Sequence, residues 1–554
     1  MTELIINIVQ YIVIAIISIW LIAKIWQRLQ LSLAKNPSLG GHLRWAKRIT
    51  MQIPGYTYKD SEWFCIDGAP VHIQNTRRQA LDKLGKDLSL RSNRTLELSS
   101  EVKPMLPDLQ FISHYRVPFQ FREVLQEHVA IGSFWKCSEG VWLTDLDGNR
   151  YIDVTGSYGV NVFGQDFYKA TIAEGSQLVH DLGPVLGYFH PCVLDNLERL
   201  RKISGKEQFT FHMSGTEAVM QAVRVARYTT GKKKIVRFTA AYHGWWDDVQ
   251  PGPGNPMPPS QHTLTLRDMH ENTLRVLRNR NDIACVLINP IQAMHPNQSA
   301  PTDNTLVAGG QRANFDRSAY TSWLKQLRQV CTDKGILLIM DEIFLGFRLA
   351  AGGAQEYFGI QADLVTYGKT LGGGLPIGVV CGNADVMTRF HHERPADICF
   401  ARGTFKEHPY VMGAMNSFLR KLETEEIQSL YLNLDSTWSA RMNQLNRLFK
   451  SEGLPLTVSG LSTVWSVNFD VPSCYNWMLQ FYMRREGIAL SWVGTGRLIF
   501  SLNFTDDDFE AFCQRFIRAA HHMAQDAWWW TPEGQTNKLI RRRILKEILR
   551  QRFL

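Results

Sequence analysis

The sequence predicts an α/β protein in which a mostly parallel sheet forms a large domain, accompanied by a smaller α+β domain. Its 554 residues are 45% apolar and 20% charged, a composition typical of a globular chain with two to four domains. Short apolar runs rich in β-branched residues alternate with helical patterns from residue 145 to residue 520. Because these runs are continuous, we expect helices to cover the sheet on both faces.

The N-terminal segment is a candidate transmembrane helix. Residues 4–23 are interrupted only by Asn7, Gln10 and Ser18, and at about 1.5 Å per residue they can cross a ~30 Å hydrocarbon core. No basic residue precedes the run, whereas Lys24 and Arg28 follow it, which is unlike a cleaved signal peptide. The positive-inside rule then places the following chain in the cytoplasm, at the inner membrane if the source is bacterial. A buried core helix is the alternative.

The strands of the expected large domain are short apolar segments. They lie at 209–211, 235–238, 284–288, 336–340, 364–367 and 379–381. From residue 415 to residue 520, long helical stretches alternate with expected strands at 463–469 and 497–502, which indicates the smaller α+β domain.

The C-terminal segment predicts a basic amphipathic helix over residues 537–554. Its apolar residues recur at helical spacing: Ile540, Ile544, Leu545, Ile548 and Leu549. Trp528, Trp529 and Trp530 precede it, and tryptophan favours the headgroup zone of a bilayer. We therefore interpret this tail as a second membrane contact, with a solvated helix packed on the body as the alternative.

The net charge of +9 is concentrated at the two ends of the chain. Six basic and no acidic residues lie between Lys24 and Arg48, and seven basic residues and one glutamate follow position 537. The body is close to neutral, so nucleic acid is not an expected partner. Nine cysteines without a CxxC pair indicate free thiols, and the adjacent histidine pairs lack metal-ligand spacing, so no metal site is expected.

Polar motifs follow several of the expected strands, at the edge where open α/β sheets bind ligands. Ser214 and Glu217 form an S-x-x-E capping box, and Gly215 leaves the helix N-terminus open to an anion such as a phosphate. Asp341 ends a buried strand, which is costly unless the carboxylate meets a cation, a metal or a polar ligand. Lys369 is not part of a P-loop, because the first glycine of that motif would fall at Asp363.

These motifs together predict a pyridoxal phosphate site. Lys369 can form an imine with the cofactor, Asp341 can pair with its pyridinium nitrogen, and the helix after Ser214 can hold its phosphate. Tyr242, in the segment Tyr242-His243-Gly244 after the strand at 235–238, supplies a ring for stacking.

The chain resembles the class III aminotransferases of fold type I. It is most similar to the branch that contains glutamate-1-semialdehyde aminomutase and the aminotransferase domains of polyketide and nonribosomal peptide synthases. The resemblance runs from residue 144 to residue 501, about two thirds of the chain. The motifs that carry it are Ser214-Gly215-Thr216-Glu217-Ala218-Val219-Met220, Tyr242-His243-Gly244, Asp341-Glu342-Ile343, Gly346-Phe347-Arg348, Gly352-Gly353-Ala354-Gln355-Glu356-Tyr357-Phe358-Gly359, Gly368-Lys369 and Gly403-Thr404-Phe405.

The resemblance implies roles for individual residues. Lys369 would carry pyridoxal phosphate and shuttle the proton, Asp341 would pair with the ring nitrogen, and Tyr242 would stack on the ring. The phosphate would be held by Ser214, Gly215 and Thr216, beside His243, with Thr404 reaching in from a second subunit of a homodimer with shared active sites.

The patterns at the two ends and the resemblance together divide the chain into segments. We expect a transmembrane anchor at 1–30, an N-terminal extension of unknown role at 31–120 and the N-terminal part of the small domain at 121–180. The cofactor-binding large domain would occupy 181–410, the C-terminal small domain 411–525 and the Trp-rich basic tail 526–554.

Departures from the family pattern lie around the pocket. The usual glutamate before Pro290 is Asn289, the usual asparagine before Ser214 is Met213, a usual tryptophan is Tyr158, and the usual histidine after Gly164 is Gln165. An arginine to grip a free substrate carboxylate has only a loose candidate in Arg122, which disfavours glutamate semialdehyde.

We therefore expect a membrane-anchored aminotransferase that transfers an amino group from an amino acid to an aldehyde or ketone on a hydrophobic or carrier-tethered acyl chain. Membrane lipid is an expected partner, and an acyl carrier protein is a candidate for delivery of the acceptor. The alternatives are an aminomutase of the glutamate-1-semialdehyde type, another pyridoxal phosphate reaction, and a non-catalytic membrane scaffold with the same fold.

Overall fold

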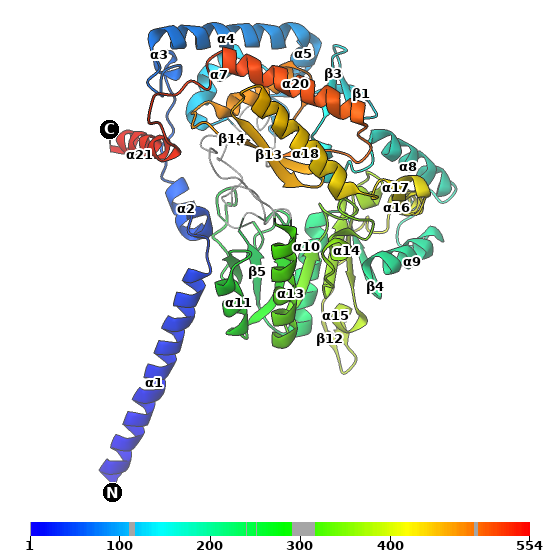
Figure 1. The fold of residues 1–554 in the computed structure, drawn as a ribbon. Helices are drawn as coiled ribbons and strands as arrows, with labels where there is room; N and C mark the ends of the chain where they lie inside the picture. The colour runs from blue at the N-terminus through cyan, green and yellow to red at the C-terminus, as the bar shows by residue number, and fades with distance from the viewer. Residues whose placement is uncertain are drawn as a thin grey trace.

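The large domain is built on a seven-stranded sheet. The computed structural model describes residues 2–109, 117–239, 241–250, 252–290, 316–491 and 497–553 (Figure 1). The strand order is β4-β10-β9-β8-β7-β5-β6. The strands are β4 (Gln208–His212), β5 (Lys234–Phe238), β6 (Thr263–Leu266), β7 (Ile283–Ile288), β8 (Leu337–Asp341), β9 (Leu364–Gly368) and β10 (Gly378–Gly382). All six expected strands are confirmed, and the short edge strand β6 was missed.

The sheet is mostly parallel, as predicted. Strand β10 is the exception, because it pairs antiparallel with both β4 and β9. The neighbouring strands from β9 to β6 pair in parallel. Their carboxyl ends therefore meet at one edge, together with the carboxyl end of β4.

Helices cover both faces of this sheet, which confirms the interpretation of the continuous apolar runs. Ile235, Cys285 and Ile339 pack in one cluster with α10 (Gly215–Thr230) and α15 (Ala384–Met387). Their chain neighbours Val236 and Val286 belong to the cluster that includes α11 (Glu271–Arg278) and α13 (Arg317–Lys334). Successive strand residues thus point to opposite, equally buried faces.

The small domain contains two further sheets. One has the order β1-β2-β3-β15 and the other β13-β14-β16. The strands are β1 (Trp135–Glu139), β2 (Trp142–Asp145), β3 (Arg150–Asp153), β13 (Leu456–Leu461), β14 (Val464–Phe469), β15 (Ile488–Ala489) and β16 (Leu498–Ile499). Helices α18 (Leu434–Ser451), α19 (Leu479–Arg485) and α20 (Asp506–Gln525) accompany them.

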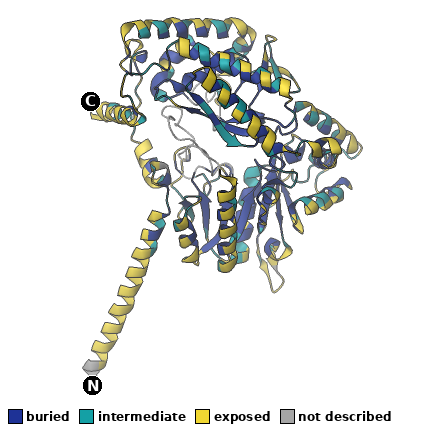
Figure 2. Ribbon diagram, in the orientation of Figure 1, coloured by how far each residue is buried: buried dark blue, intermediate teal, exposed yellow. Residues whose placement is uncertain are grey.

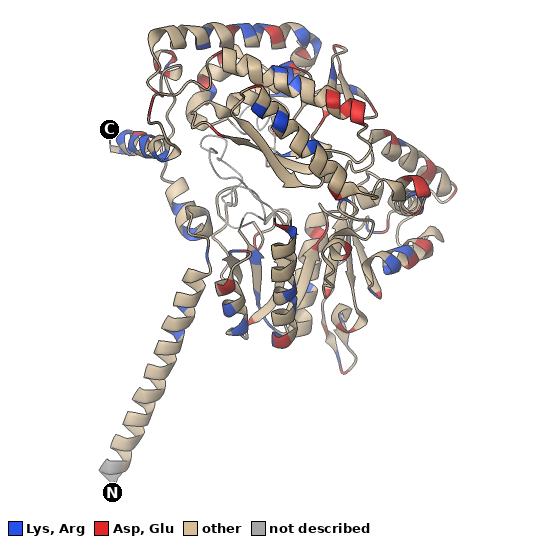
Figure 3. Cartoon of the chain, in the orientation of Figure 1, with Lys and Arg blue, Asp and Glu red and all other residues tan. Residues whose placement is uncertain are grey.

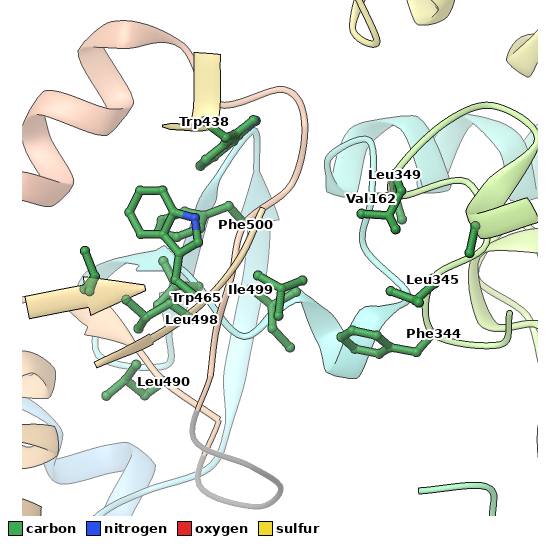
Figure 4. Close-up of a cluster of buried hydrophobic side chains, with 14 of the residues drawn as sticks. Val162, Phe344, Leu345, Leu349, Trp438, Trp465, Leu490, Leu498, Ile499 and Phe500 are labelled. Carbon is green, nitrogen blue, oxygen red and sulfur yellow. The ribbon is translucent and has the colours of Figure 1, made fainter. Parts of the chain in front are cut away.

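The cores of the two domains meet below the second of these sheets. Figure 4 shows Trp438, Trp465 and Phe500 on the small-domain side and Phe344 and Leu345, from the loop after β8, on the other. Ile499 lies between them. This apolar junction holds the loop after β8 against the small domain.

Helices α8 (Gln165–Leu178) and α16 (Pro409–Leu422) pack closely where two glycines face each other. A Cβ on Gly175 would lie 2.3 Å from the Ala414 nitrogen, and one on Gly413 would lie 2.3 Å from the Gly175 oxygen. Only glycine allows this approach of the two backbones. Other elements of the chain are α9 (Cys192–Ser204), α14 (Gly353–Phe358), α17 (Glu425–Ser429), β11 (Phe390–His391) and β12 (Arg394–Ile398).

The N-terminal extension folds onto the small domain. It contains α2 (Leu43–Thr50), α3 (Asp60–Trp63), α4 (Val71–Arg91) and α5 (Asn93–Val102), and α7 (Arg122–His128) follows it. Trp63 packs edge-on against Trp528 of the C-terminal tail at a centroid distance of 5.8 Å and against Trp477 of the small domain at 6.1 Å. The extension and the tail therefore share one aromatic cluster with the small domain.

The proposed headgroup location is wrong for Trp528 and Trp529, because both are buried. The Trp528 indole nitrogen donates to the Tyr482 hydroxyl at 2.7 Å, and that of Trp529 donates to the Asn476 side chain at 3.0 Å. A buried indole with a satisfied N–H serves the core and is not free to reach a bilayer.

Arg77 is the polar centre of this cluster. Its guanidinium is fully buried, lies 2.7 Å from Asp67 and donates to the carbonyl of Ala527 in the tail at 3.0 Å. It also lies over the Tyr475 ring at 4.4 Å. One side chain therefore joins α4, the tail and the small domain.

Arg77→Ala is expected to lower the free energy of unfolding by about 3–5 kcal/mol, because Asp67 is left as an unpaired buried charge. Arg78→Ala is the matched control, since its ion pair with Asp60 is exposed and is worth about 0–1 kcal/mol. Thermal unfolding in detergent measures both. Equal melting temperatures for the two variants would show that the buried pair does not hold the extension.

Helix α1 (Thr2–Leu33) projects from the body (Figure 1). Its residues Ile5–Leu33 contain an 18-residue stretch with a mean hydropathy of 2.5, and the helix is long and apolar enough to span a membrane. Figure 2 shows most of its described length exposed, and none of its apolar stretch is buried, so the alternative of a buried core helix is not supported.

The expected C-terminal helix is present as α21 (Asn537–Phe553). Ile540 is buried, whereas Leu545 and Leu549 are exposed. Glu547 accepts hydrogen bonds from Tyr58 at 2.6 Å and Tyr56 at 3.1 Å. The helix is thus attached to the extension on one side.

Candidate active site

Lys369 begins the turn that follows β9, as the first residue of the 3-10 helix η5 (Lys369–Gly372). Its φ of 49° is left-handed, which costs a non-glycine residue about 1–2 kcal/mol and is typical of functional sites. Its Nζ donates to the backbone carbonyl of Tyr158 and lies 5.0 Å from the centre of the Phe344 ring. A Cβ on Gly159 would lie 2.5 Å from the Phe344 ring, so a glycine leaves room for this ring beside the amine.

The amine of Lys369 is more easily deprotonated than that of an exposed lysine. Its pKa is lowered to about 8, chiefly by burial and next by the nearby Arg348 guanidinium, while Asp341 acts in the opposite direction. An amine with a pKa near neutrality is a nucleophile and a proton acceptor under cellular conditions.

Asp341 ends β8 and is buried beside His243. The Nδ1 of His243 lies 2.7 Å from its Oδ2, while the Ile343 amide and the Thr366 hydroxyl donate to Oδ1 at 3.1 and 3.3 Å. Burial lowers the pKa of His243, although Asp341 opposes this effect. The neutral imidazole therefore donates to the carboxylate and orients it.

The start of α10 forms an open helix N-terminus. The hydroxyl of Ser214 accepts a hydrogen bond from the Glu217 amide at 3.2 Å, which is one half of the expected capping box. The Glu217 carboxylate accepts a hydrogen bond from the Met213 amide at 3.0 Å and not from the Ser214 amide. Gly215 and Thr216 supply the first two amides of the helix, which have no carbonyl partner within it.

Close packing ties this helix start to the other strand ends. A Cβ on Gly215 would lie 2.8 Å from the Ile343 side chain, directly after Asp341 and Glu342. Gly244, with φ +94°, faces Thr216, where a Cβ would lie 2.6 Å from the hydroxyl oxygen. The structure thus brings together the segments after β4, β5, β8 and β9 that carry the expected residues.

Tyr242 and Thr404 lie at the surface of the chain. More than half of the Tyr242 side chain is exposed. Partial desolvation of its hydroxyl, and next the nearby Asp341 carboxylate, raise the pKa of Tyr242. Thr404 is exposed in the loop between β12 and α16. The predicted contact of Thr404 with a second subunit stays a prediction.

Arg348 is a site residue whose role the sequence left open. It is fully buried, and it donates to the Phe500 carbonyl at 2.8 Å, the Thr463 hydroxyl at 2.9 Å and the Asn161 carbonyl at 3.0 Å. Its charge faces Lys369 while its hydrogen bonds hold the small domain. The sequence analysis also missed the backbone carbonyl of Tyr158 as a partner of Lys369. The only sequence signal for a tight turn there was the pair of glycines on either side of Ser157-Tyr158.

The donor set fits pyridoxal phosphate. The Lys369 amine, the Asp341 carboxylate and the N-terminus of α10 lie at one edge of the sheet. The buried imidazole of His243 contacts the carboxylate, and its Nε2 has no hydrogen-bond partner among the described residues. The cofactor would supply an electron-withdrawing ring that stabilises negative charge on the substrate carbon.

Comparison with known proteins identifies the family. The Aminotransferase class-III family profile matches residues 125–520. A glutamate-1-semialdehyde 2,1-aminomutase of Geotalea daltonii is 30% identical over 367 residues, covering 62% of this chain and 78% of the relative. The corresponding protein of Methanocaldococcus jannaschii is 29% identical over 407 residues, covering 70% and 86%. The chain therefore belongs to the class III aminotransferases, which are pyridoxal-phosphate-dependent enzymes.

Solved structures share its fold. A β-phenylalanine aminotransferase from Variovorax paradoxus superposes with a TM-score of 0.63 at 24% identity and covers 81% of this chain and 98% of its own. A glutamate-1-semialdehyde aminomutase from Pseudomonas aeruginosa also gives 0.63, at 17% identity, with coverages of 81% and 98%. The fold is that of the fold type I enzymes, and members of this family are typically homodimers.

Proposed function

We propose that this enzyme is a membrane-anchored aminotransferase that moves an amino group from an amino acid to an aldehyde or ketone on a hydrophobic or carrier-tethered chain. The observation that carries the proposal is α1, an exposed apolar helix on the same chain as a class III aminotransferase domain. A tether concentrates the enzyme where apolar acceptors are made or held.

In this proposal Lys369 holds the cofactor and moves a proton to and from the substrate carbon, a role suited to its lowered pKa. Asp341, oriented by His243, would face the ring nitrogen. Ser214, Gly215 and Thr216 would bind the phosphate.

Two further contacts complete the proposed site. The exposed ring of Tyr242 would stack on the cofactor, and Thr404 would serve the neighbouring subunit of a homodimer. The active sites would thus be shared between the two subunits.

The acceptor is expected to differ from a small free carboxylic acid. The loose candidate for a carboxylate grip, Arg122, donates to the carbonyl of Val117 in its own segment at 2.9 Å. The pocket region also carries Met213 and Tyr158 where the family has asparagine and tryptophan. An uncharged, apolar chain is the acceptor class that these features favour, and an acyl carrier protein is one way to deliver it.

The arrangement of α1 bears on how the acceptor arrives. Lys369 and Asp341 lie at the carboxyl edge of the sheet, whereas α1 leaves the body beside α11 and points away from that edge (Figure 1). In this proposal the substrate reaches the site from the side of the body that faces away from the bilayer. This favours a diffusible or carrier-bound chain over a lipid that remains in the bilayer.

Transfer to aldehydes of four, eight and twelve carbons, with glutamate or alanine as donor, tests the proposal. We expect kcat/KM to be at least about tenfold higher for twelve carbons than for four, because each buried CH₂ contributes about 0.8 kcal/mol. Formation of the donor's keto acid in the detergent-solubilised enzyme is the measurement. Equal rates for all chain lengths would refute the hydrophobic acceptor, and conversion of glutamate-1-semialdehyde without a donor would establish the aminomutase instead.

A further inference from the structure

The end of α1 is fixed to the large domain by specific contacts. Gln30 is buried, and its side-chain oxygen accepts a hydrogen bond from Asn279 at 3.1 Å. The carbonyl of Leu33 accepts one from Asn272 at 3.3 Å, and the carbonyl of Ala34 accepts one from the Arg267 amide at 2.9 Å. The helix is therefore docked on the body and not merely linked to it.

These contacts fix the position of α11 along the axis of α1, relative to the apolar part of that helix. Asn279 directly follows α11 and is level with Gln30, whereas Asn272, near the start of α11, is level with Leu33. From Ala23, where the apolar run ends, to Gln30 the helix rises about 10 Å. The headgroup layer on each side of a bilayer is roughly 5–8 Å thick. The end of α11 thus lies at the outer limit of the headgroups.

Basic residues gather at this level. Arg275 and Arg278 are exposed on the last turns of α11. The start of β5 joins them, because the Lys234 amide donates to the Asp282 carbonyl at 3.0 Å next to Arg280. We call this set the basic edge: Lys232, Lys233, Lys234, Arg275, Arg278 and Arg280.

The basic edge keeps a net positive charge after its ion pairs are considered. Glu271 pairs with Arg278 at 2.7 Å, and Asp282 lies 2.6 Å from Arg280 and 3.7 Å from Lys234. In Figure 3 the lower end of α11 is blue, at the same height as the blue positions of α1. Those positions are Lys24 and Arg28, the basic residues of α1.

We infer that the basic edge binds the phosphate groups of anionic phospholipids and forms a second attachment beside α1. The inference rests on the proposed membrane anchoring. Long basic side chains can cover the remaining distance to the phosphates while their charges stay in the polar layer. Two attachments would limit tilting of the body relative to the bilayer and hold the carboxyl edge of the sheet, with Lys369, away from the bilayer.

The basic helix α21 does not share this position. Its Glu547 is bound to Tyr56 and Tyr58, and α1 leads away from it in Figure 1. Its lysines, Lys538 and Lys546, therefore serve as an internal control for the basic edge.

The test is footprinting of lysines in the full-length cofactor-loaded enzyme with a water-soluble amine-reactive reagent. The enzyme is compared in detergent, in phosphatidylcholine nanodiscs and in nanodiscs with three parts phosphatidylglycerol to seven parts phosphatidylcholine. We expect Lys233 to be labelled at least about threefold more slowly in the anionic discs than in detergent, and Lys538 and Lys546 to react equally in all three.

The charge-reversal variant Arg275→Glu/Arg278→Glu is expected to restore labelling of Lys233 in anionic discs. Arg541→Glu/Arg542→Glu on α21, which also reverses two charges, should leave the protection unchanged. Unprotected Lys233 in protein that co-elutes with discs would overturn the basic-edge inference and leave the anchor intact. Protein that fails to enter discs at all would overturn the anchor and the inference together.

Discussion

Lys369→Ala is expected to reduce the turnover number for amino transfer by at least about 10³-fold. The amine provides both the covalent attachment of the cofactor and the proton transfer, and positioned acid–base groups alone contribute about 10²–10⁴-fold. The measurement is steady-state formation of keto acid from the amino donor, alongside a melting curve that verifies folding.

Lys421→Ala is the matched control for this substitution. Lys421 lies on α16, outside the site, and forms an ion pair with Glu174 of α8 at 2.8 Å. Loss of the Lys421 amine should therefore leave turnover unchanged. If Lys369→Ala kept more than a tenth of the wild-type rate, the catalytic role proposed for Lys369 would be wrong. A folded wild-type protein without measurable amino transfer would instead favour the non-catalytic scaffold.

The same lysine predicts how cofactor uptake depends on pH. Only the unprotonated amine attacks an aldehyde, so uptake by the cofactor-free protein should quicken as pH rises and level off above the lysine's pKa of about 8. An ordinary lysine would continue to gain rate up to about pH 10.5. A stopped-flow absorbance series from pH 6 to pH 10 distinguishes the two curves.

Asp341→Asn is expected to lower the turnover number by about 10²–10³-fold. Asparagine keeps the size of the side chain but removes the negative charge that would hold the cofactor's ring nitrogen protonated, and with it the electron-withdrawing character of the ring. The hydrogen bond from the Nδ1 of His243 would remain, since that nitrogen lies 2.7 Å from the Asp341 carboxylate. The loss should therefore appear in kcat and only weakly in the KM of the amino donor.

Asp363→Asn is the control for that substitution, because Asp363 lies just before β9, at the opposite edge of the sheet. It pairs with Arg328 at 2.7 Å and accepts the Leu338 amide at 2.6 Å, so the variant should lose stability without losing kcat. Comparable kcat losses in the two variants would mean that Asp341 acts through the fold and not on the cofactor.

The sequence predicted the large-domain sheet because its information is local. A buried parallel strand is a continuous apolar run, and each run was visible on its own, from the strand at 235–238 to that at 379–381. The edge strand β6 was missed because four alternating residues carry too weak a pattern. The family motifs marked the turns after the strands, and the fold brings those turns to one edge.

The sequence could not predict contacts between distant segments. Trp528 looked like a headgroup residue because its neighbours in sequence are aromatic and basic, but its neighbour in space is Trp63. Arg348 had no assigned role until its hydrogen bonds to Phe500 and Asn161 showed that it bridges the domains beside Lys369.

The sequence by itself thus determined the α/β class, the family motifs and the apolar helix at the N-terminus, since each depends on residues close together in the chain. Only the tertiary structure decided the environment of the Lys369 amine and the height of the basic edge relative to α1. Burial and electrostatic interaction depend on distance in space, and the residues that supply them are separated by up to hundreds of positions in the sequence.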